Sequence, residues 1–84
     1  MLIPRPLSIR QPQVGKLIRE LRLETKLTQE QFAAHLGLTY SSINRWENGH
    51  SQPSPLAMQK IEVLLNSLGD RGKDLLAKHS VNSF

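Results

Sequence analysis

The chain has 84 residues, enough for one domain with a modest core. It lacks cysteine, which excludes disulfide bridges and thiolate metal sites, and its apolar runs are too short for a membrane span or a secretory signal. The 11 Lys and Arg residues outnumber the 7 Asp and Glu residues, and the resulting net charge of +4 favours a polyanionic partner of a soluble, cytoplasmic protein.

The chain begins with a segment that resists both helix and strand, because three of its first twelve residues are proline. We expect residues 1–12 to form a flexible basic arm. Its Arg5 and Arg10 either have no function or contact the phosphates of a polyanionic partner. From Val14 onward, apolar residues recur with the period of a helix, which predicts a first helix from about Gln13 to Thr25.

Two short helices follow, joined by a tight turn. Thr28 and Gln31 have the spacing of a capping box, so a second helix begins there and ends at Gly37. Thr39 is a good cap for a third helix, which closes at the pair Asn48-Gly49.

The remainder of the chain predicts two more helices. Ser54 as cap and Pro55 at the first helical position open a helix that stops at Gly69. We expect its inward face to consist of Leu56, Ala57, Ile61, Leu64, Leu65 and Leu68. Asp70 is expected to cap a short last helix, and residues 80–84 form a tail. The sequence therefore predicts an all-α fold, a compact bundle of four to five short helices over residues 13–79.

The third helix has two unlike faces. Ile43 and Trp46 lie on one side, and the opposite side carries Ser41, Asn44, Arg45 and Asn48. Such polar groups suit hydrogen bonding to base edges and phosphates, although the same pattern also describes an ordinary solvated surface. Trp46 is interpreted as a core anchor rather than as a stacking platform for single-stranded bases.

Catalytic and metal sites are not indicated. The histidines His35, His50 and His79 are far apart and show no metal-ligand spacing, so no metal or other cofactor is expected. There is no phosphate-binding glycine loop and no nucleophile constellation, so the chain is not expected to be an enzyme.

Taken together, several segments resemble the lambda-repressor-like (XRE or Cro type) helix-turn-helix family over roughly Val14 to Leu68. The segments are Leu27-Thr28-Gln29-Glu30-Gln31-Phe32-Ala33, Leu36-Gly37-Leu38-Thr39, Ser42-Ile43-Asn44-Arg45-Trp46-Glu47-Asn48-Gly49 and Pro53-Ser54-Pro55. The resemblance implies a DNA-binding domain that inserts helix 39–48 into a major groove.

The resemblance also implies roles for individual residues. The base-reading residues would be Tyr40, Ser41, Asn44 and Arg45, and the phosphate-binding residues Gln29, Thr39, Asn48 and Arg22. Glu47 would pair with Arg22 and support the third helix together with Trp46 and Ile43. Alternatively, Arg22 and Glu47 are ordinary surface charges, and Tyr40 packs its ring instead of contacting a base.

The chain departs from many relatives at Tyr40, Ser41 and His50, so a DNA target cannot be copied from them.

The function expected on this basis is sequence-specific binding of double-stranded DNA by a transcriptional regulator. It would be a repressor, located on the nucleoid if the source is bacterial. A homodimer would read a near-palindromic operator. Its interface would use Leu75, Leu76, Val81 and Phe84, unless these residues cap the monomer's own core. The alternatives are an antitoxin with a toxin partner and a protein-interaction module without DNA binding.

Overall fold

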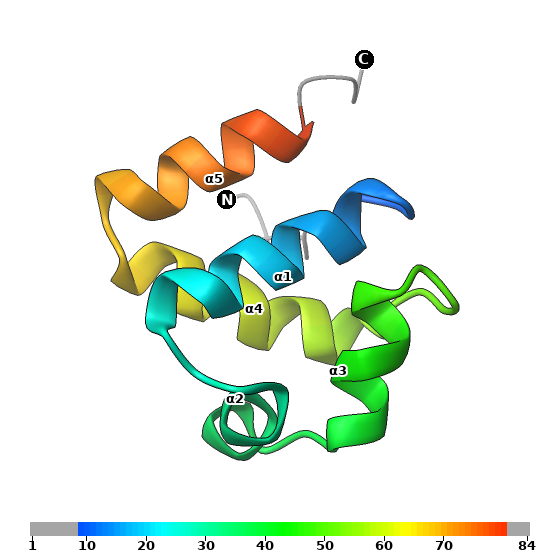
Figure 1. Ribbon diagram of the computed structural model, residues 1–84. Coiled ribbons are helices and arrows are strands. Elements are labelled where there is room, and N and C mark those ends of the chain that lie inside the picture. Colours follow the sequence, from blue (N-terminus) through cyan, green and yellow to red (C-terminus); the bar gives the residue numbers. More distant parts are fainter. Residues whose placement is uncertain (1–8, 81–84) are drawn as a thin grey trace.

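Five α-helices follow one another along residues 9–80, the part of the chain that the computed structural model describes (Figure 1). They are α1 (Gln13–Thr25), α2 (Gln29–Leu36), α3 (Tyr40–Glu47), α4 (Pro55–Ser67) and α5 (Asp70–Ser80). No strand occurs in this range, which confirms the predicted all-α bundle. Residues 1–8 of the expected arm, with Arg5, and the tail residues Val81 and Phe84 lie outside the described residues.

Local chemistry sets most of the helix ends. The hydroxyls of Thr28, Thr39 and Ser54 each accept a hydrogen bond from a backbone N–H in the first turn of α2, α3 and α4. Gly37 ends α2 with a φ of 70°, a left-handed conformation that glycine adopts without steric cost. Asp70 was expected to cap α5, but it is the first residue of that helix, where its charge still complements the helix dipole.

A single hydrophobic core lies between the helices. Its fully buried side chains are Val14, Leu17, Ile18, Leu21, Phe32, Ile43 and Ile61. One inward residue was predicted wrongly: Leu56 is 64% exposed, and Met58 is buried instead. The buried face of α4 centres on Ala57, Met58 and Ile61, and at 100° per residue Leu56 falls nearly opposite that centre.

Two glycines allow helices to approach each other closely. A Cβ atom added to Gly15 in α1 would lie 2.3 Å from the carbonyl oxygen of Trp46 in α3. A Cβ atom at Gly72 in α5 would lie 1.9 Å from the carbonyl oxygen of Leu65 in α4. Both distances are far below van der Waals contact, so each crossing requires a residue without a side chain.

The residues just before α1 pack onto the domain. Ile9 is buried in the core. The Gln11 side chain donates to the carbonyl oxygens of Trp46 (2.9 Å) and Ser51 (2.8 Å). Gln52 accepts from the Gln11 backbone N–H (3.0 Å) and donates to the Ile9 carbonyl (2.9 Å), which makes a reciprocal clamp. The predicted boundary at residue 13 is therefore corrected, because the packed domain already includes residues 9–12.

Helix α5 lies against α1, and polar contacts hold its C-terminal end there. The Lys78 ammonium donates to Glu20 (2.7 Å), and the His79 ring contacts the same carboxylate. Leu75 and Leu76 are partly buried against the core, which favours the interpretation that they cap the monomer's own core. Lys78, and after it His79, holds the pKa of the Glu20 carboxyl below its usual value.

Replacing Glu20 with glutamine should lower the free energy of unfolding at pH 7 by at most about 1 kcal/mol, because Lys78 is exposed and Glu20 itself is partly exposed to solvent. A carboxyl whose pKa is lowered by folding stabilises the fold above its unfolded pKa, and this contribution is lost as the pH falls through the folded pKa. Urea unfolding at pH 7 and at pH 3 measures the difference, which should be smaller at the lower pH. Glu62→Gln, which changes a carboxyl outside any ion pair of the described residues, is the control. An equal loss at both pH values would contradict an electrostatic role of Glu20.

Candidate functional site

Helix α3 is anchored on one side and open on the other. Ile43 is fully buried and Trp46 is 8% exposed, which confirms that the indole belongs to the core. Ser41, Arg45 and Asn48 are exposed on the other side of the helix. Figure 1 shows α3 at an edge of the molecule.

The turn between α2 and α3 consists of Gly37, Leu38 and Thr39. The Leu38 N–H donates to the Ala33 carbonyl at 2.8 Å, which closes the end of α2. The Thr39 hydroxyl accepts from the Ser42 backbone N–H at 3.2 Å and donates to the Ser42 hydroxyl at 2.8 Å. Thr39 thus fixes the direction in which α3 leaves the turn. Two short helices in this arrangement form a helix-turn-helix.

An ion pair joins α1 to α3. The Arg22 guanidinium donates through Nε to Glu47 Oε2 at 2.7 Å and through Nη2 to Glu47 Oε1 at 3.0 Å. The alternative that these are ordinary surface charges is wrong, because the side chains are only 14% and 4% exposed. The hydrogen bonds to Glu47 raise the pKa of Arg22. Arg22 also donates to the Leu27 carbonyl at 3.1 Å, so it ties three segments together.

Amide side chains extend this ion pair toward the open face. Gln29, the first residue of α2, donates from Nε2 to Glu47 Oε1 at 3.1 Å. Asn44 donates from Nδ2 to Gln29 Oε1 at 3.1 Å, and Asn48 donates from Nδ2 to Asn44 Oδ1 at 3.2 Å. We call these five residues, Arg22, Glu47, Gln29, Asn44 and Asn48, the polar relay. All five were candidate site residues from the sequence, and the fold brings them together.

The remaining candidates lie beside the relay. Tyr40, the first residue of α3, is 50% exposed, so its ring does not pack into the core. Ser41 and Arg45 are exposed, and the Arg45 guanidinium makes no hydrogen bond or ion pair within residues 9–80. Because the Glu47 side chain is buried against Arg22, α3 exposes no carboxylate on its open face.

Sequence reasoning missed two residues that hold α3 in place. Gln11 binds the Trp46 carbonyl near the C-terminal end of the helix, and Gly15 lets α1 approach that same carbonyl. Both contacts join residues that are more than 30 positions apart in the chain. No local signal marks such a contact.

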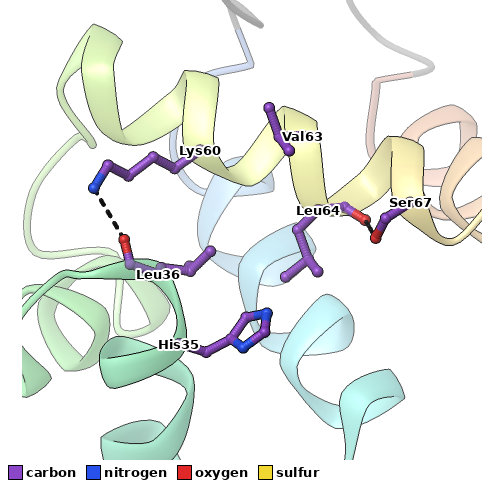
Figure 2. Close-up of a pocket in the computed structure, with 6 residues that line it drawn as sticks. All are labelled: His35, Leu36, Lys60, Val63, Leu64 and Ser67. Atoms are coloured by element: carbon purple, nitrogen blue, oxygen red, sulfur yellow. Dashed lines mark hydrogen bonds between the residues drawn. The ribbon is translucent and has the colours of Figure 1, made fainter.

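A pocket lies elsewhere, between α2 and α4 (Figure 2). It is an open depression of about 350 Å³, lined by His35, Leu36, Lys60, Val63, Leu64 and Ser67. Across it, the Lys60 ammonium donates to the Leu36 carbonyl at 3.0 Å, at the C-terminal end of α2. None of the predicted site residues lines this pocket, so it is separate from the relay.

Residues 9–80 contain neither a cluster of metal ligands nor a membrane-spanning helix. In this range, no three His, Asp or Glu side chains gather as metal ligands would. No helix among the described residues combines the length and the apolar character that a membrane crossing requires.

Comparisons with known proteins agree with this geometry. Residues 18–69 match the model of a protein family described as Helix-turn-helix. The chain is 36% identical over 52 residues to the uncharacterized HTH-type transcriptional regulator RghRB of Bacillus subtilis (strain 168). That alignment covers 61% of this chain and 37% of the relative, so the chain spans little more than a third of the relative's length. No solved structure matches the chain. The family match includes every predicted site residue.

Proposed function

Because this chain belongs to the helix-turn-helix family, of the XRE type, we propose that it binds double-stranded DNA in a sequence-specific manner and regulates transcription. The observation that carries the proposal is the open face of α3, a row of hydrogen-bonding side chains above a buried Ile43 and Trp46. An α-helix with such a face fits a major groove, where each base pair presents its own pattern of donors and acceptors. The proposed role is binding without catalysis.

Four residues read bases in this proposal. Arg45 has a guanidinium that is not bound within the described part of the chain, and it suits the two acceptors of guanine, N7 and O6. Asn44 suits adenine, which offers one acceptor and one donor. Tyr40 and Ser41, at the N-terminal end of α3, contact the flanking bases through their hydroxyls.

Phosphate contacts position the domain. Gln29 lies at the N-terminal end of α2, where backbone N–H groups and the helix dipole favour an anion. Thr39 and Asn48 lie at the two ends of α3 and contact the flanking backbone. Arg22 has used three of its N–H groups within the protein, and the remaining ones face a phosphate.

We further infer that two copies bind a near-palindromic operator and repress transcription by occluding a promoter. One domain of this size buries little surface on DNA, whereas two copies about 34 Å apart meet successive major grooves on one side of the duplex. A protein of this kind works in the cytoplasm, on the nucleoid of a bacterium. The contacts of Leu75 and Leu76 with the core favour an interface outside α5.

Selection on randomised duplex DNA tests the proposed function. The wild-type chain should enrich a two-fold symmetric motif, and Asn44→Ala/Arg45→Ala should not. Each bidentate base contact is worth about 1–3 kcal/mol, so the double variant should lose roughly 2–6 kcal/mol of discrimination. The control is Asn66→Ala/Arg19→Ala, which removes the same residue types from exposed positions outside α3.

The alternatives give different results in this experiment. A protein-interaction module would enrich no motif even at low salt, and its weak binding to duplex DNA would lack the steep salt dependence of counterion release. An antitoxin would enrich a motif, and it would also co-purify with a toxin from its native cells. Enrichment that survives in the double variant would refute the assignment of Asn44 and Arg45.

A further inference from the structure

The amide side chains of the polar relay donate in one direction, toward Glu47, and the Glu47 carboxylate determines this direction. Glu47, ionised and paired with Arg22, carries only hydrogen-bond acceptors. Gln29 must therefore turn its Nε2 toward Glu47, which turns its Oε1 toward Asn44. Asn44 must in turn present Nδ2 to Gln29, and its Oδ1 is left to accept from Asn48. Reversing any one amide would place two donors or two acceptors opposite each other.

Building on the proposed function, we propose that the Glu47 carboxylate, acting through Gln29, fixes the orientation of the Asn44 amide and thereby sets adenine as the base that Asn44 reads. Glu47 and Gln29 are positioning residues in this scheme, since neither touches the base. With the amide so oriented, Asn44 keeps one Nδ2 hydrogen and one Oδ1 lone pair for a ligand. Because the amide is held one way round, the donor and the acceptor come in one fixed order, which suits the order of N7 and N6 along the edge of adenine. Guanine offers two acceptors at the same edge, and an amide free to reverse would present its two groups in either order.

The scheme predicts that the carboxylate at position 47 and the amide at position 44 can be exchanged. Asn44→Asp alone should be poorly tolerated, because Gln29 would then face acceptors on both sides. Adding Glu47→Gln relieves the conflict at Gln29, which reverses, donates to the new carboxylate and accepts from the new amide. Arg22 then keeps its hydrogen bond from Nε and loses the one from Nη2 in either background. Asn44→Asp should thus lower the Tm by several degrees more in the wild-type background than in the Glu47→Gln background.

Direct repulsion between two carboxylates would produce the same pattern, so the cycle is repeated with Gln29→Met, which keeps the side-chain length and removes the amide. The coupling between positions 44 and 47 should then disappear. Coupling that persists without Gln29, or no coupling in its presence, would overturn the proposal. These measurements need no DNA, so they stand even if the proposed function fails.

Base preference supplies a second measurement. A carboxylate at position 44 accepts from cytosine N4, so Asn44→Asp/Glu47→Gln should exchange adenine for cytosine at one position of each half-site. Glu47→Gln alone should weaken the preference for adenine there and leave the preference set by Arg45 unchanged. A wild-type adenine preference that is unchanged in Glu47→Gln would contradict the proposal. If no chain selects any motif, the proposed function fails together with the assignment of adenine, and the thermal cycle alone decides whether Glu47 orients Asn44 through Gln29.

If a variant does not fold, the wild-type chain provides the measurement. The side-chain amide resonances of Gln29 should show nuclear Overhauser contacts that place its Nε2 hydrogens beside Glu47 rather than beside Asn44. The opposite arrangement would overturn the proposal without any substitution.

Discussion

Replacing Gly15 with alanine is expected to destabilise the domain by about 3 kcal/mol, although alanine is the better helix former by about 1 kcal/mol. The added Cβ would lie 2.3 Å from the Trp46 carbonyl oxygen and 2.9 Å from the Gln11 side-chain oxygen. One of these neighbours is backbone in α3 and cannot turn aside, so α1 and α3 must separate. Thermal unfolding should show a loss of roughly 15 °C, since 1 kcal/mol shifts the Tm of a domain of this size by about 4–8 °C.

The sign of the change makes this prediction decisive. An uncrowded glycine inside a helix would gain stability on conversion to alanine, so a higher Tm would show that the close crossing of α1 and α3 does not exist in solution. Gly72→Ala is the useful comparison, because it crowds the Leu65 carbonyl in α4 and leaves the crossing of α1 and α3 intact. Both variants should lose stability, but of the two only Gly15→Ala displaces α3 itself.

Truncating Trp46 to alanine is expected to cost about 3–5 kcal/mol, because the indole fills the space between α3 and the rest of the core. A domain of this size has a total stability of roughly 5–10 kcal/mol, so the variant should be close to unfolding at 37 °C. Chemical denaturation at 10 °C measures the loss. DNA binding should fall with it, since α3 loses its larger anchor.

Trp46→Phe is the matched control, because it keeps an aromatic ring in the core and should lose clearly less stability than the alanine variant. A Trp46→Ala protein that unfolds at the same denaturant concentration as the parent would show that the indole is outside the core. Stacking on unpaired bases would then become the better interpretation of this residue.

The helix ends could be predicted from the sequence because they depend on residues only a few positions apart. Thr28 and Gln31 form the expected capping box, and Gly37 and Gly69 have the left-handed conformation expected after α2 and α4. The end of α1 gave no such signal, since Lys26 takes the left-handed position with a φ of 61°. Local patterns thus predicted these three helix ends, but they did not predict the end of α1, where Lys26 has a conformation that is unusual for its residue type.

Long-range packing could not be predicted in the same way. Ile9 and Gln11 were assigned to an arm because three prolines surround them, yet their partners Trp46 and Gln52 lie far along the chain. Leu56 was placed inward because it is apolar, whereas only the position of the neighbouring helices decides which side of α4 is buried. Such contacts depend on how whole helices cross, which no short segment encodes.

The candidate site could be predicted in part. The period of α3 separated Ile43 and Trp46 from the polar face, and the structure confirms that division. The pairing of Arg22 with Glu47 came from the family resemblance alone, since 25 residues separate the two. The hydrogen bonds of Gln29 to Glu47 and Asn44 required the structure, because they depend on how α2 and α3 face each other.

The polar relay draws its members from three helices, and α3 has only eight residues. A peptide with the sequence of residues 39–49 would contain the proposed base-reading side chains but would not hold them in position, because so short a helix is not stable alone in water. The site therefore exists only in the folded fraction of the molecules. By mass action, any ligand that binds this face raises the midpoint of unfolding in proportion to the logarithm of its concentration. A melting curve is thus also a binding measurement for this domain, and it requires no label.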